Sequence, residues 1–332
     1  MYLYRTILKK SAQIVWKFKH LWFFGFFAAF LGGFLEFELI FNKTGPDFGH
    51  RFLNNVSSLK STGILSKSFL FNFGKLFKND PISMVILLTI ILIILVLLGF
   101  LLWLSVVSQG GLVNNSSNII DNKGEANIQK GVESGVKNFW KILGINLVVK
   151  FCIYFILLIL SLLIFFISYN STLLSSMLLI NLLLFIVFIP LTLVLAFIAK
   201  YAVCYAVIKG DSFISAIKKA FNLFIKNWLV SVEMAFILFF ISFIVGFAIL
   251  IGLTLVFIPI LLLFNLAVYF SWVMLSFWIF ISGIILLAVL MALAGSALSA
   301  FRITAWTGFF IRLNSSKGGM SKLARLAAKL KK

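Results

Sequence analysis

Long apolar stretches alternate with short, polar and basic segments along this chain. Four of the stretches are Leu21–Phe41, Pro81–Val107, Leu143–Ile167 and Leu173–Ile208. A fifth, Trp228–Ile311, is long enough for two or three helices. Because about 20 apolar residues cross the hydrocarbon core of a bilayer as a helix, each stretch predicts at least one transmembrane helix.

The positions of lysine and arginine predict an even number of crossings. Basic residues precede the first apolar stretch, occur throughout the connectors 108–141 and 200–227, and follow Leu313, whereas the turn at 168–176 has none. Cytoplasmic segments carry the excess of Lys and Arg, so these four basic segments share one side only if the spans come in pairs. We therefore expect about six spans in the cytoplasmic (plasma) membrane with both termini cytoplasmic. The basic loop 42–80 is the exception to this pattern.

Two of the apolar stretches admit a second interpretation. A cleavable signal peptide is the alternative for Leu21–Phe41, although no A-x-A site closes it. Residues 250–270, which contain Gly252, Pro259 and Asn265, fit either a longer helix pair or a re-entrant segment. Under both interpretations the fold class is all-α, a polytopic transmembrane helical bundle.

Two amphipathic segments, each directly before an apolar stretch, share one pattern. Residues 124–143 and 209–228 place six apolar side chains at the same spacing, 85 residues apart. The first set is Ile128, Val132, Val136, Phe139, Trp140 and Leu143, and the second is Phe213, Ile217, Phe221, Phe224, Ile225 and Trp228. An apolar stripe on a 3.6-residue period with lysine opposite predicts a helix that lies in the headgroup layer. We interpret the two segments as interfacial helices and as an internal repeat, and chance similarity is the alternative.

These segments also predict which side chains anchor the chain at the membrane surface. The expected anchors are Phe139, Trp140, Lys141, Phe224, Lys226 and Trp228. A weaker copy of the pattern opens the chain, at Leu3, Ile7, Ile14, Val15 and Phe18. We therefore expect three units of one interfacial helix and one helical hairpin each, and a flexible joint at Gly110–Gly111.

The expected domain organisation is one transmembrane domain, 1–314, with units at about 1–108, 124–208 and 209–313. A basic tail, 315–332, follows it. Its residues Lys322, Arg325 and Lys329 lie beside a leucine stripe, which predicts a surface helix on anionic lipid. A frayed tail in water is the alternative.

The composition excludes a soluble globule. The chain is 62% hydrophobic and 11% charged, whereas soluble domains are nearer half apolar and a quarter charged. The net charge of +20 would suggest nucleic acid in a soluble protein. Here the basic residues flank apolar spans, so we expect membrane lipids with anionic headgroups as partners and no nucleic acid. The sequence leaves protein partners and oligomerisation open.

The sequence contains no motif typical of catalysis. The two histidines, His20 and His50, and the two cysteines, Cys152 and Cys204, have no metal-ligand spacing, and no phosphate-binding glycine loop is present. We therefore expect a protein that is not an enzyme and has no cofactor and no metal. An enzyme acting on lipid would need an arrangement of Glu36, Glu38 and His50.

Two charges near the starts of apolar stretches form a candidate pair. In the 85-residue register Glu233 matches Val148, two residues from Lys150. A buried charge is unfavourable in a bilayer, so we hypothesise that Lys150 and Glu233 form an intramembrane ion pair. The alternative is that each reaches water alone.

Three segments resemble one bacterial family. They are SVVSQGGLVNNSSNIIDNKGEANIQKGVESGVKNFWKILGINL, AKYAVCYAVIKGDSFISAIKKAFNLFIKNWL and the opening SAQIVWKFKHLWFFG. They resemble the multi-pass membrane domain fused to some bacterial glycerophosphodiester phosphodiesterases, and related stand-alone six-span proteins. The phosphodiesterase activity belongs to a separate soluble domain, so the resemblance implies a bacterial membrane protein without a catalytic residue here.

The favoured function is therefore a membrane bundle that organises lipid or partner proteins. A transporter, channel or export component is the alternative. That alternative requires a polar path through the bundle, for which the candidates are Lys150, Glu233, Asn181 and Asn265.

Overall fold

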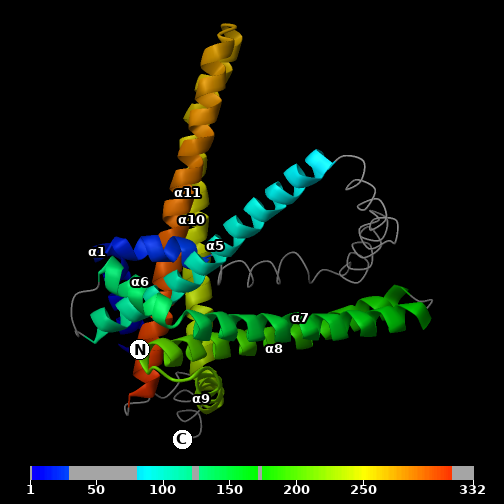
Figure 1. Cartoon of the computed structure of the whole chain (residues 1–332), viewed down its shortest axis with the longest axis vertical. Helices are drawn as coiled ribbons and strands as arrows, with labels where there is room; N and C mark the ends of the chain where they lie inside the picture. Colours follow the sequence, from blue (N-terminus) through cyan, green and yellow to red (C-terminus); the bar gives the residue numbers. More distant parts are fainter. Residues whose placement is uncertain (1, 30–80, 122–126, 171–173, 316–332) are drawn as a thin grey trace, which may run out of the picture. The chain divides into compact units, whose positions relative to one another are not determined.

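The fold is built from helices of very different length and polarity. The computed structural model describes residues 2–29, 81–121, 127–170 and 174–315, which form helices and no strand (Figure 1). In chain order the helices are α1 (Tyr2–Lys17), a short apolar helix (His20–Ala29), α5 (Pro81–Ile120), α6 (Ile128–Lys137), α7 (Phe139–Asn170), α8 (Leu174–Ile208), α9 (Phe213–Lys226), α10 (Trp228–Tyr269) and α11 (Val273–Asn314).

Five of these helices, namely α5, α7, α8, α10 and α11, contain stretches long and apolar enough to cross a membrane. The all-α, multi-pass membrane fold expected from the sequence is thereby confirmed. The first expected span, Leu21–Phe41, lies partly outside the described residues, so the sixth crossing stays a prediction.

The chain divides into two compact units. The first combines Met1–Leu31, Ser105–Ile145 and Phe197–Lys332, and the second combines Gly32–Leu104 and Asn146–Ala196. Helices α5, α7 and α8 each begin in one unit and end in the other. In the second unit, α7 and α8 pack through buried Ile153, Leu157 and Phe188.

Helix α5 continues well past the expected end of its span at Val107. Its last part, Ser105–Ile120, is rich in small polar residues that are buried in the first unit, such as Ser108 and Ser116. The Ser116 hydroxyl lies 2.9 Å from that of Thr304 on α11. This partner lets a polar sequence extend the helix, because a buried hydroxyl needs a hydrogen bond.

The expected joint at Gly110–Gly111 is wrong, because both glycines lie within α5 and are buried. They face Gly131 and Gly135 of α6, where the backbones approach closely: a Cβ on Gly111 would lie 2.7 Å from the Gly131 carbonyl oxygen. Residues without a Cβ permit such a close approach of two helices. The glycines therefore fix the contact between α5 and α6 and do not loosen the chain.

The α10–α11 hairpin settles the two interpretations of residues 250–270. Both helices are 42 residues long, and α10 continues through Pro259 to Tyr269 before a tight turn at Ser271, whose φ is 57°. The segment is therefore part of a longer helix pair and is not re-entrant. The helices of the other hairpin, α7 and α8, have 32 and 35 residues.

Candidate functional site: the amphipathic helices and their base

One local arrangement occurs three times in the described residues. An amphipathic helix (α1, α6 or α9) is followed after a break of one or two residues by an apolar helix. In two cases the break is an asparagine that leaves helical geometry, Asn138 (ψ 10°) and Asn227 (ψ 29°). Each asparagine side chain donates a hydrogen bond from Nδ2 to the carbonyl four residues earlier, at 3.0 Å to Ser134 and 3.1 Å to Leu223. This bond stabilises the end of the amphipathic helix, as polar side chains at helix ends commonly do.

These breaks correct the expected boundaries. The segments 128–143 and 213–228 are not single helices, because Phe139, Trp140 and Lys141 belong to α7 and Trp228 belongs to α10. The breaks lie 89 residues apart, and α9 has 14 residues against 10 in α6. The matched apolar positions therefore differ by one helical turn from the register that the breaks define.

Helix α9 has three distinct faces. Ala216, Ala220 and Phe224 are buried, and Phe224 stacks on Phe197 of α8 with ring centroids 5.6 Å apart. A second face leaves large apolar side chains exposed at intervals of seven and four residues: Ile214, Phe221 and Ile225. A third carries exposed lysines and asparagine: Lys218, Asn222 and Lys226. An exposed apolar face beside a basic face is typical of a helix that lies in a headgroup layer.

The two other amphipathic helices also pack through small side chains. Gly131 and Gly135 form the inner side of α6, while Lys130 and Lys137 are exposed. Phe24 of the short apolar helix is fully buried at this crossing, since a Cβ on Gly131 would lie 2.7 Å from its Cζ. The basic residues of α6 therefore point away from the contact with α5.

Helix α1 lies against α11, at the far end of the chain (Figure 1). Tyr4, Ser11 and Val15 face inward and are buried, whereas Lys9 and Trp16 are exposed. The ring of Tyr4 contacts that of Phe309, at 6.5 Å between centroids. The first amphipathic helix is thus fixed to the last apolar one.

We call the assembly of α1, α6 and α9 with Ser105–Ile120 of α5, Phe197–Ile208 of α8 and the last turns of α11 the base. It contains most of the fully buried large side chains of the first unit, including Tyr201, Phe309 and Phe310. The Tyr201 hydroxyl lies 2.7 Å from that of Ser231 on α10. A packed interior with paired hydroxyls indicates a fixed structure that can hold the exposed faces in place.

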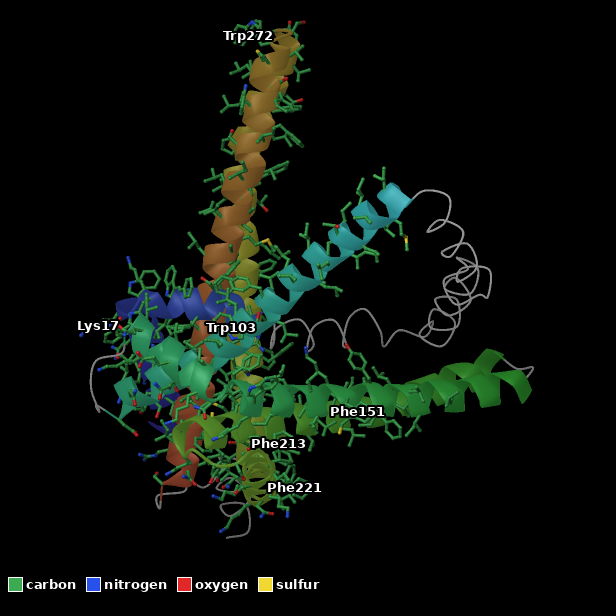
Figure 2. The ribbon with its side chains drawn as sticks, viewed as in Figure 1. Lys17, Trp103, Phe151, Phe213, Phe221 and Trp272 are labelled. Carbon is green, nitrogen blue, oxygen red and sulfur yellow. The ribbon has the colours of Figure 1, made fainter. Side chains whose placement is uncertain are left out.

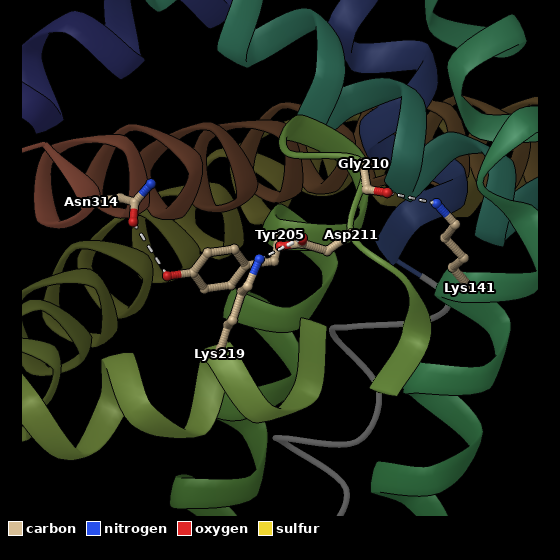
Figure 3. Close-up of polar contacts among 6 residues, drawn as sticks. All are labelled: Lys141, Tyr205, Gly210, Asp211, Lys219 and Asn314. Carbon is tan, nitrogen blue, oxygen red and sulfur yellow. Dashed lines mark hydrogen bonds and ion pairs between the residues drawn. The ribbon is translucent and has the colours of Figure 1, made fainter. Parts of the chain in front are cut away.

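The turn between α8 and α9 is fixed to the base by two lysines (Figure 3). Lys141 Nζ donates to the Gly210 carbonyl oxygen at 3.2 Å, and Lys219 Nζ lies 2.6 Å from Asp211 Oδ1. Gly210 has a φ of 71°, a conformation that favours glycine. Lys141, expected at the membrane surface, therefore also holds the turn from which α9 begins.

The expected anchors thus have different surroundings. Trp140 and Trp228 are strongly exposed, at 79% and 56%, and Lys226 is exposed on α9. Phe224 is buried in the base and cannot enter lipid. Figure 2 shows Phe213 and Phe221 on α9, and only Phe221 of these two is exposed.

The candidate ion pair of Lys150 and Glu233 stays a prediction, but its motivation changes. Lys150 belongs to the second unit and Glu233 to the first. Counted from the breaks at Asn138 and Asn227, Lys150 lies twelve residues into its span and Glu233 six. They are therefore not level in the register that the breaks define.

Glu233 has a partner that the sequence did not predict. The hydroxyl of Tyr4 on α1 donates a hydrogen bond of 2.5 Å to Glu233 Oε2 on α10. No local pattern connects two residues 229 positions apart, and only the docking of α1 on the last hairpin brings them together.

Some candidate residues lie outside the described residues: Glu36, Glu38, His50, Lys322, Arg325 and Lys329. Within the described ranges, no group of three or more His, Cys, Asp or Glu side chains could hold a metal ion. The geometry that the structure does describe is that of a surface for binding.

No known protein family, curated protein or solved structure matches this chain. The resemblance to the membrane domain of glycerophosphodiester phosphodiesterases therefore stays a prediction.

Proposed function

We propose that the chain is a non-catalytic bacterial protein of the cytoplasmic membrane, which organises anionic lipid or partner proteins around its base. The observation that carries this proposal is the surface of α9, where exposed Ile214, Phe221 and Ile225 adjoin exposed Lys218 and Lys226. Apolar side chains of this kind enter the headgroup boundary, and each nearby lysine contributes about 1 kcal/mol of attraction to an anionic surface.

The distribution of charge supports a cytoplasmic base. The three amphipathic helices carry exposed basic residues, among them Lys9, Lys137 and Lys226. An excess of Lys and Arg marks the cytoplasmic side of membrane proteins. Both termini are cytoplasmic in this proposal, because α1 and the end of α11 belong to the same base.

A transporter, channel or export component is the alternative, and the described residues give it no specific support. Asn265 donates its amide hydrogen to the Leu261 carbonyl of its own helix at 2.8 Å, and Glu233 accepts a bond from Tyr4. Both polar groups of the expected path thus serve the protein's own structure.

The proposal is tested by the lipid shell of the reconstituted protein. In vesicles containing equal phosphatidylglycerol and phosphatidylcholine, spin-labelled phosphatidylglycerol should be enriched several-fold among motionally restricted lipids. Lys218→Gln/Lys226→Gln should lower that enrichment by about half, because two of the exposed basic groups are removed.

The matched control is Lys218→Arg/Lys226→Arg, which keeps the charge and should keep the enrichment. Equal restriction of the two lipids around the wild-type protein would overturn the proposed binding of anionic lipid.

A further inference from the structure

The α10–α11 hairpin is longer than an ordinary bilayer requires. No Asp, Glu, Lys, Arg or His occurs from Met234 to Phe301. At 1.5 Å per residue, α10 rises about 53 Å from Met234 to Tyr269, and α11 rises about 42 Å from Val273 to Phe301. The hydrocarbon core of a typical bilayer is about 30 Å thick.

The other hairpin provides an internal comparison. The charge-free part of α7, from Phe151 to Asn170, rises about 29 Å, and that of α8, from Leu174 to Ala199, about 38 Å. The excess length is therefore a property of α10 and α11 and not of every helix in the chain.

Polar side chains in the outer half of the hairpin are adapted to a medium without water. Four of them donate a hydrogen bond to a carbonyl of their own helix, at 2.7–3.1 Å in the measured cases: Thr254, Asn265, Ser276 and Ser282. Such bonds satisfy a polar group where lipid offers no partner. Because Asn265 lies about 48 Å along α10 from Glu233, the surface compatible with hydrocarbon extends almost to the tip.

The two helices remain packed together to the tip, so the hairpin cannot shorten by opening. Phe264 and Phe280 have ring centroids 5.8 Å apart, and Ala267 is buried. Beyond them, Tyr269 (81%) and Trp272 (57%) are exposed at the turn (Figure 2). Tyrosine and tryptophan are the residues enriched where a membrane meets water.

From these lengths and side chains we infer that the α10–α11 hairpin is fitted to a hydrocarbon layer thicker than 30 Å, and that it selects lipids with long acyl chains. Tilt does not remove the mismatch. Transmembrane helices tilt by up to about 40°, and at that angle the 53 Å of α10 still spans about 41 Å. In a thick layer Tyr269 and Trp272 lie at the far headgroups, whereas in a thin layer they emerge into water.

This inference rests on the proposed role in organising lipid and adds the lipid class to it. Acyl-chain length and headgroup charge are separate variables. A test in uncharged phosphatidylcholine can therefore fail without affecting the proposed binding of anionic lipid, and the reverse also holds.

The experiment measures whether the tip is in water. Ser271→Cys in a Cys152→Ala background is labelled with a fluorophore, and buried Cys204 stays in place. The full-length protein is reconstituted in phosphatidylcholine with 18-carbon or 24-carbon chains, and quenching by aqueous iodide is measured. We expect quenching to be at least about threefold weaker in the 24-carbon bilayer.

A shortened variant tests whether length is the cause. Deletion of residues 249–255 and 288–294 removes two turns from each helix at the same level, about 10 Å, and should protect the tip in the 18-carbon bilayer too. The length-preserving control changes the same fourteen positions to leucine and should behave as the unshortened protein does.

Three results would overturn the inference. Equal quenching in both bilayers, whether strong or weak, would show that the tip is always in water or that the hairpin tilts to fit. Protection that rises with protein density at fixed lipid would show that a second copy covers the tip. A shortened variant that folds and shows the unshortened pattern would remove length as the cause; if it does not fold, the comparison of the two bilayers decides.

Discussion

At the scale of single residues, the closest contacts in the base are made by residues that have no side chain. Gly131 and Gly135 of α6 lie against Gly110, Gly111 and Val107 of α5. The four glycines are visible in the sequence, but their pairing is not, since a glycine can equally mark a joint. Only the packing of the two helices distinguishes a close crossing from a flexible connection.

We predict that Gly135→Ala destabilises the protein by about 1–3 kcal/mol, because its Cβ would collide with the Val107 backbone carbonyl. Unfolding in detergent, followed by circular dichroism against denaturant, measures the change. The control is Gly252→Ala in α10, where a Cβ meets no atom within 4 Å. Equal losses from both substitutions would contradict the close crossing.

A second residue-scale prediction concerns the contact between α1 and α10. Tyr4→Phe removes the hydroxyl that donates to Glu233 and should reduce the free energy of unfolding by about 1.5–3 kcal/mol, since the acceptor is a carboxylate. Tyr269→Phe, at the exposed hairpin tip, should have no such effect in the same unfolding assay. An unchanged midpoint for Tyr4→Phe would show that the bond adds no stability.

At the scale of secondary structure, the spans and amphipathic helices were predictable but their register was not. Six apolar residues repeated on a 3.6-residue period look the same after a shift of one turn, because the same face stays apolar. The positions that define the register are Asn138 and Asn227, where the helices break. Their side chains act locally, so the pairs Lys137–Asn138 and Lys226–Asn227 were the available signal.

The break at Asn227 should be sensitive to its side chain. Asn227→Leu removes the bond to the Leu223 carbonyl and favours one continuous helix through Trp228. We expect a loss of about 1 kcal/mol in unfolding free energy, and a longer distance between spin labels at 215 and 240. Asn222→Leu, on the exposed face of the same helix, is the matched control and should keep the distance.

At the scale of the whole molecule, composition and the distribution of lysine determine more than any motif does. They indicate an all-α membrane protein, and five of the expected spans are present among the described helices. The base was not predicted, because it depends on contacts between distant segments, such as α1 with α11 and Ser116 with Thr304. Local periodicity cannot reveal which small polar residues meet.

The central claim is that each amphipathic helix lies along the membrane surface before the chain turns into the bilayer. The most direct test is the depth of single spin labels along α9 in phosphatidylglycerol vesicles, measured from accessibility to oxygen and to a water-soluble nickel complex. Labels at Ile214, Phe221 and Ile225 should lie at one shallow depth just below the headgroups, while a label at Asn222 should be in water. A depth that increases steadily from Ile214 to Ile225, or four labels equally in water, would contradict the account.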